Sequence, residues 1–169
     1  MNTYDQQKAA RVWQRVRAEG EQPRPDRAAE LPELIMNEWN MAAIYLQLAR
    51  QMQPKQAQAL QQLSREELAH ASCLKGIYTL MTGQRAVTRS PQPEKEPPEV
   101  TLRKCYGREM RSLKEYEERS ADPEYGHVFS RMARQEQEHC RTLLELLGGL
   151  ERKGKTPPGR RRRFAHRQG

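Results

Sequence analysis

The sequence predicts an all-α protein, a four-helix bundle whose two helix pairs are joined by one long connection, with an extra helix at the N-terminus. Long stretches of the chain are rich in Ala, Leu, Glu, Gln, Arg and Met, which are good helix formers. Phe, Ile and Val are too sparse to supply several strands. Glycine and proline cluster outside these stretches and divide the chain into segments of helical length.

The first of these segments, residues 3–19, predicts an amphipathic helix within an N-terminal region of residues 1–20. Its apolar residues recur on one side at helical spacing: Ala9, Val12, Trp13 and Val16. We expect Val12, Trp13 and Val16 to pack on the bundle or on a second subunit. A proline-containing linker, residues 21–31, follows this helix.

Four further helices are expected within a bundle domain of residues 32–150. They cover residues 32–52, 55–82, 100–119 and 123–147. Gly83 is expected as a C′ residue and Asp122 as an N-cap, while Gly148–Gly149 should end the last helix. Residues 84–99 are too rich in proline to be helical, so they form the long crossover between the two helix pairs.

Most of the net charge of +8 lies in residues 151–169, which carry eight Lys and Arg against one Glu. We expect this segment to be a disordered basic tail. A solvated tail is the simpler interpretation, although Arg160–Arg163 could bind nucleic acid or another acidic surface. The N-terminus has no apolar signal-like segment, and no stretch approaches about 18 uninterrupted apolar residues. A soluble, cytoplasmic protein without a membrane partner is therefore expected.

The cysteines argue against two kinds of site. Cys73, Cys105 and Cys140 are odd in number and far apart, and the chain has no Cys-x-x-Cys motif. A disulfide framework and a thiolate metal site are therefore not expected. We interpret the three thiols as small core residues rather than as redox groups.

Two copies of one pattern of chemically active residues stand 71 residues apart. Each copy has a Glu, a Tyr seven residues later, and a Glu-x-x-His on the next helix. The copies are Glu38, Tyr45, Glu67 and His70, and Glu109, Tyr116, Glu136 and His139. Four carboxylates and two imidazoles are the ligand set with which helix bundles bind a pair of iron or manganese ions.

Spacing within a hairpin distinguishes this set from a chance match. Glu109 lies 13 residues before Asp122 and Glu136 lies 13 after Pro123, roughly 20 Å along each helix. A competing set matches the same pattern: Glu99, Tyr106, Glu124 and His127. That set cannot converge, because its first Glu lies more than 20 residues before the turn and its second lies at the turn.

All six candidate ligands fall on apolar stripes that face the bundle interior. Four buried carboxylates would repel one another, and no Lys or Arg occupies these stripes. Protonation could relieve part of the repulsion, but two divalent cations would cancel four negative charges directly. Bulk water would be excluded by Met41, Leu74, Met132 and Leu143.

Two alternative interpretations stay open at this point. Ser64-x-x-Glu67 matches a capping box, which would place Glu67 at a helix start instead of in a metal site. Tyr45 and Tyr116 are candidate catalytic residues that could hydrogen-bond to the ligands, but they could also be ordinary core tyrosines.

Residues 32–148 resemble the rubrerythrin branch of the ferritin-like superfamily. The matching stretches are NEWNMAAIYLQLA, LSREELAHASCLKGIY, REMRSLKEYEERS and DPEYGHVFSRMARQEQEHC. The resemblance implies a ferritin-like fold and a centre of two iron ions, with iron–manganese or manganese as alternatives and zinc as an adventitious substitute. Glu67 and Glu136 would bridge the metals. The terminal ligands would be Glu38 with His70, and Glu109 with His139.

The resemblance also implies a redox function. Members of this family reduce hydrogen peroxide or react with dioxygen. Rubrerythrins proper carry a rubredoxin domain with paired Cys-x-x-Cys motifs, so here electrons would come from a separate donor, rubredoxin-like or other. A homodimer is expected. Two rival functions stay open: an iron-handling or ferroxidase-type protein without turnover, and a structural bundle whose basic tail binds nucleic acid.

Overall fold

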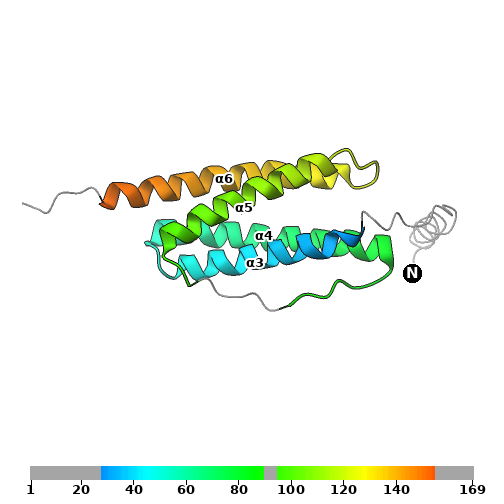
Figure 1. The fold of residues 1–169 in the computed structure, drawn as a ribbon, viewed down its shortest axis with the longest axis horizontal. Helices are drawn as coiled ribbons and strands as arrows, with labels where there is room; N and C mark the ends of the chain where they lie inside the picture. Colours follow the sequence, from blue (N-terminus) through cyan, green and yellow to red (C-terminus); the bar gives the residue numbers. More distant parts are fainter. Residues whose placement is uncertain (1–27, 90–94, 155–169) are drawn as a thin grey trace, which may run out of the picture. The chain divides into compact units, whose positions relative to one another are not determined.

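The part of the protein that the structure describes is all-helical, as the sequence predicts. The structure is a computed structural model that describes residues 28–89 and 95–154. These ranges contain four helices and no strand, which is consistent with a helical bundle. Figure 1 labels them α3 (Leu31–Ala49), α4 (Pro54–Thr82), α5 (Pro98–Arg119) and α6 (Gly126–Gly154). The predicted N-terminal helix and residues 155–169 of the basic tail lie outside the described residues.

The described residues divide into two compact units. One contains residues 28–46 and 62–89, and the other contains residues 47–61 and 95–154. Helix α4 therefore begins in the second unit and ends in the first. Each unit contains one of the two predicted Glu, Glu and His groups.

In the first unit, α3 and α4 pack as an antiparallel pair. Ser64 Oγ on α4 donates a 2.9 Å hydrogen bond to the carbonyl oxygen of Ala42 on α3. Further along, His70 of α4 lies beside Glu38 of α3. Residue numbers thus rise on α4 as they fall on α3, which defines the antiparallel direction. The interior of the pair is apolar, with Ile35 and Leu74 fully buried.

In the second unit, α5 packs against α6 in the same antiparallel manner. The rings of Tyr116 and Phe129 stack with their centroids 6.1 Å apart, near the turn that joins the two helices. His139 lies beside Glu109 further from the turn. Leu102, Met132 and Leu143 are fully buried in this unit.

One predicted helix-end signal, at Gly83, is confirmed, and the one at Asp122 is confirmed only in part. Gly83 has φ of 70°, and its N–H donates to the carbonyl oxygen of Thr79 at 2.8 Å, as expected of a C′ glycine after α4. Asp122 Oδ1 accepts hydrogen bonds of 2.9 Å from the N–H groups of Glu124 and Tyr125. Such bonds are typical of an N-cap, but here they lie in the turn before α6, because that helix begins at Gly126, three residues later than predicted.

The predicted end of the last helix is wrong. Helix α6 continues through Gly148 and Gly149 to Gly154, so the segment assigned to a disordered tail begins as helix. A glycine in a helix costs only about 1 kcal/mol relative to alanine. Burial of Leu146 and Leu147 on the preceding turn offsets a cost of that size. Among the described helices, none combines the length and apolarity needed to cross a bilayer.

Candidate metal centre

All six predicted ligands are buried, as their apolar stripes require. Each side chain belongs to a residue with at most 2% of its surface exposed. They are Glu38 on α3, Glu67 and His70 on α4, Glu109 on α5, and Glu136 and His139 on α6. Carboxylates are seldom buried to this extent without a compensating positive charge, a shared proton or a metal.

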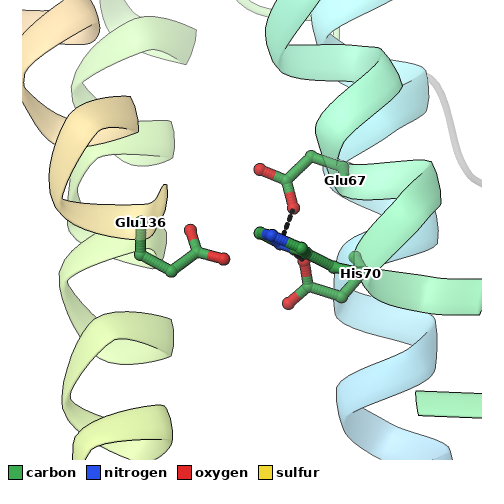
Figure 2. A group of neighbouring side chains, drawn as sticks. Glu67, His70 and Glu136 are labelled. Carbon is green, nitrogen blue, oxygen red and sulfur yellow. Dashed lines mark ion pairs between the residues drawn. The ribbon is translucent and has the colours of Figure 1, made fainter. Parts of the chain in front are cut away.

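The first trio consists of Glu38, Glu67 and His70. Each offers a ligand atom, and these atoms lie within 4.8 Å of one another. His70 Nδ1 is 3.4 Å from Glu38 Oε2 and 3.7 Å from Glu67 Oε2. Figure 2 shows the His70 ring turned toward the Glu67 carboxylate, one helical turn away on the same helix. The Glu-x-x-His spacing of α4 thus aims both side chains at one point.

The second trio consists of Glu109, Glu136 and His139, and it repeats the arrangement of the first. Its ligand atoms also lie within 4.8 Å of one another. His139 Nδ1 is 3.7 Å from Glu109 Oε2 and 3.3 Å from Glu136 Oε2. In both trios, therefore, the histidine presents Nδ1 to one carboxylate from its own helix and to one from the adjacent helix.

The distances between these polar atoms fit ligands of a shared cation better than hydrogen bonds. An N–H···O hydrogen bond usually measures about 2.7–3.2 Å, whereas the four Nδ1···Oε2 distances run from 3.3 to 3.7 Å. Two ligands bound at about 2.0–2.2 Å to one metal are separated by roughly 2.8–3.6 Å in octahedral or tetrahedral geometry. Each trio therefore has nearly the dimensions of a metal site.

The charge of each trio also fits a divalent cation. Two carboxylates and one neutral imidazole carry a charge of −2, which a single divalent ion cancels. Carboxylate and imidazole together suit iron, manganese and zinc, so the donor set does not choose among these metals. Neither group of close ligand atoms in the described residues includes a cysteine.

Glu109 shows how the trio behaves without a cation. Burial, with the hydrogen bond to Glu136 and the negative charge of Glu136, raises the pKa of its carboxyl from 4.5 to about 7. His139 acts in the opposite direction. A proton thus takes the place of positive charge between two buried carboxylates, and a metal ion would have to displace it.

The two tyrosines and the four proposed water-excluding residues are buried as well. Tyr45 and Tyr116 have no exposed surface, and each lies two turns beyond a trio glutamate on the same helix face. The other buried residues are Met41, Leu74, Met132 and Leu143. Burial agrees with both interpretations of the tyrosines, as core residues and as partners of the ligands.

The capping-box interpretation of Ser64-x-x-Glu67 is wrong. Helix α4 begins at Pro54, so Ser64 lies well inside it. The Ser64 hydroxyl is bonded to the Ala42 carbonyl on the neighbouring helix rather than to its own backbone N–H groups. The spacing of residues along α4 could not reveal this inter-helix bond, because it depends on how α3 packs.

The competing constellation is excluded as predicted. Glu99 is exposed and pairs with Arg103 at 2.9 Å, one turn along α5. Both Glu124, in the turn before α6, and His127, in the first turn of α6, are exposed. None of the three belongs to a cluster of close ligand atoms in the described residues.

The cysteines are free thiols, with Cys105 and Cys140 buried and Cys73 half-buried. Burial raises the pKa of Cys140 to about 11, and the charges of Glu109 and Glu136 act in the same direction. Cys140 therefore remains protonated at neutral pH, as expected of a core residue. Comparison of this chain with protein-family models, with curated proteins and with solved structures gave no match.

Proposed function

We propose that this protein binds two metal ions, most readily iron, and uses them to reduce peroxide or to react with dioxygen. The observation that carries the proposal is the repetition of one buried trio of two carboxylates and one imidazole in both units. The resemblance to the rubrerythrin branch of the ferritin-like superfamily supports the same function. A chain with one such trio would be a weaker candidate, because two-electron chemistry favours a pair of metals.

In this proposal the trios supply the ligands in equivalent roles. Glu38 with His70, and Glu109 with His139, are the terminal ligands. By the resemblance, Glu67 and Glu136 would bridge the two metals. The Nδ1 atom of each histidine faces its carboxylate neighbours, so Nδ1 is the ligand atom that the geometry favours.

When bound, iron at this centre would supply electrons and polarise the O–O bond of the substrate. The protein residues contribute binding and shielding. Met41, Leu74, Met132 and Leu143 would exclude bulk water, and the buried hydroxyls of Tyr45 and Tyr116 would orient ligand carboxylates. Reduction of peroxide to two waters needs two electrons and two protons, and the electrons come from a separate donor protein.

The central test is metal analysis of the full chain purified without chelator. We expect about two metal ions per chain, as in helix-bundle dinuclear sites, and loss of both in Glu67→Ala and Glu136→Ala. Glu99→Ala is the matched control, because Glu99 is exposed and should change nothing. Wild-type protein that contains no stoichiometric iron, manganese or zinc would end the proposal.

Activity separates an enzyme from an iron-handling protein with the same ligands. The iron-loaded, reduced protein should be reoxidised by peroxide repeatedly when a reductant is present. Oxidation of ferrous iron without repeated turnover, accompanied by accumulation of iron beyond the dinuclear centre, would support the iron-handling alternative instead.

A further inference from the structure

The outer side of the α3–α4 pair carries an exposed apolar surface. Leu46 on α3 is 43% exposed and Leu68 on α4 is 38% exposed. The half-buried Trp39 lies seven residues, or two turns, before Leu46 on the same side of α3. Side chains of this size are normally covered when several lie together, so this surface indicates a binding partner.

The register of the two helices makes these side chains neighbours. Lys75 Nζ of α4 lies 4.6 Å from the centroid of the Trp39 ring on α3. The Ala42–Ser64 and Glu38–His70 contacts set the register of the pair and place Trp39 level with Leu68. Leu46 lies two turns further along α3, and Lys75 lies two turns away in the opposite direction, on α4. The four side chains, here called the outer face, therefore form one strip along the pair.

The equivalent strip on the other pair is less apolar. The offsets that relate the two trios place Met110 and Leu144 at the positions of Trp39 and Lys75, and both are exposed. At the positions of Leu46 and Leu68 that pair has Glu117 and Gln137. Two polar residues thus occupy the positions at which the outer face has two leucines. The outer face therefore gains more than the other strip when a partner covers it.

We propose that the N-terminal segment, residues 3–19, covers the outer face with its apolar side. The sequence of this segment has one apolar stripe at helical spacing: Ala9, Val12, Trp13 and Val16. This stripe has about as many apolar side chains as the outer face, which has two leucines and a tryptophan. Amphipathic helices commonly bury such a stripe in the groove between two other helices.

Chain length allows this placement. The segment is joined to the start of the first unit by residues 20–27, which can span at most roughly 26–29 Å when extended. From Leu31 to Leu46 along α3 is roughly 22 Å at 1.5 Å per residue. The segment can therefore reach every residue of the outer face from its own chain, without help from a second copy.

Fluorescence of Trp13 tests the proposal directly. The chain has only two tryptophans, so Trp39→Phe leaves Trp13 as the single reporter while keeping an aromatic side chain on the outer face. In the full-length Trp39→Phe protein we expect emission shifted to shorter wavelength and weaker acrylamide quenching than in a free peptide of residues 1–19. Adding Leu46→Glu and Leu68→Glu should return both readings to the peptide values.

Two further variants make the result specific. Met110→Glu with Leu144→Glu adds the same charges to the other pair and should leave Trp13 emission unchanged. Val12→Glu with Val16→Glu changes the segment instead of the surface and should mimic Leu46→Glu with Leu68→Glu. Because Leu46, Leu68, Met110 and Leu144 are all exposed, the far-ultraviolet circular dichroism of these variants should remain that of the Trp39→Phe parent.

Three outcomes would overturn the proposal. Trp13 emission equal to that of the free peptide would show that the segment covers nothing. Trp13 emission that is shifted to shorter wavelength but does not change when Leu46→Glu and Leu68→Glu are added would place the segment elsewhere. A shift that disappears on dilution, together with a change of sedimentation from dimer to monomer, would assign the outer face to a second copy of the chain.

Discussion

Glu109 is the residue whose chemistry is most sensitive to its surroundings. Its carboxyl keeps a proton to about pH 7 because the residue is buried next to Glu136, whereas in the unfolded chain it loses the proton near pH 4.5. Folding of the metal-free protein therefore takes up a proton between these two values. This uptake couples stability to pH in a direction opposite to that of an ordinary surface carboxylate.

The expected result is a metal-free protein that loses stability as pH rises. The contribution of Glu109 is fully present below about pH 4.5 and is lost as pH rises through about 7. The difference amounts to at most about 3 kcal/mol of unfolding free energy. Urea denaturation of chelator-treated protein from pH 5 to 8 would measure it. Glu109→Gln should flatten this slope, and a slope of the opposite sign in the wild type would contradict the assignment.

Ser64 offers a second prediction. Its buried hydroxyl joins α4 to α3 through a 2.9 Å hydrogen bond to the Ala42 carbonyl oxygen. Ser64→Ala should lower the unfolding free energy by about 1–2 kcal/mol, since the Ala42 carbonyl loses a partner without gaining water. Ser72→Ala is the control. Ser72 is exposed and bonds only within α4, to the Leu68 carbonyl, so its loss should stay within about 0.5 kcal/mol.

At this scale the sequence predicted the ligands but not Ser64. Spacings of three, four and seven residues identify which side chains share a helix face, so the burial of Glu38, Glu67 and His139 could be anticipated. The partner of Ser64 lies on another helix and has no signature in the local sequence. A Ser-x-x-Glu pattern instead suggested a cap, which the proline at the true helix start makes unnecessary.

At the scale of elements, the predicted ends of α4 and α5 were right, whereas the start and the end of α6 were both misplaced. Asp122 binds two successive N–H groups, a role that its residue type already indicates. Gly148 and Gly149 gave a stop signal that the structure does not follow, since α6 runs on to Gly154. A glycine ends a helix only where the chain needs a left-handed residue, as at Gly83.

Alanine substitutions distinguish the two kinds of glycine. A Cβ at Gly148 meets nothing within 4 Å, so Gly148→Ala should stabilise the helix by about 0.5–1 kcal/mol through its propensity. A Cβ at Gly126 would collide with the carbonyl oxygen of Ser120 in the turn before α6. Gly126→Ala should therefore destabilise the protein by about 1–3 kcal/mol. Thermal unfolding would measure both, and equal effects would show that the turn tolerates a side chain.

At the scale of the whole molecule, the lengths of the connections were the useful signal. A tight turn after α3, another after α5 and a long proline-rich segment between the pairs predicted two helix pairs, and α3–α4 and α5–α6 are the pairs observed. The sequence also placed one trio in each pair. It could not show how far the two trios depend on each other, because that depends on shared ligands rather than on periodicity.

Metal binding should stabilise the whole chain, and the response of one variant tells whether the trios are coupled. At a free metal concentration 100-fold above its dissociation constant, the gain in unfolding free energy is about 2.7 kcal/mol for one site. This gain raises the melting temperature by roughly 5–10 °C for a chain of this length.

If Glu136 bridges two metals, Glu136→Ala should abolish the rise in melting temperature and the binding of both metal ions together. If each trio acts alone, the variant should keep one ion per chain and part of the rise. Calorimetry with iron or manganese, paired with metal analysis, separates the two outcomes. We expect the first, which follows from the proposed bridging role of Glu136.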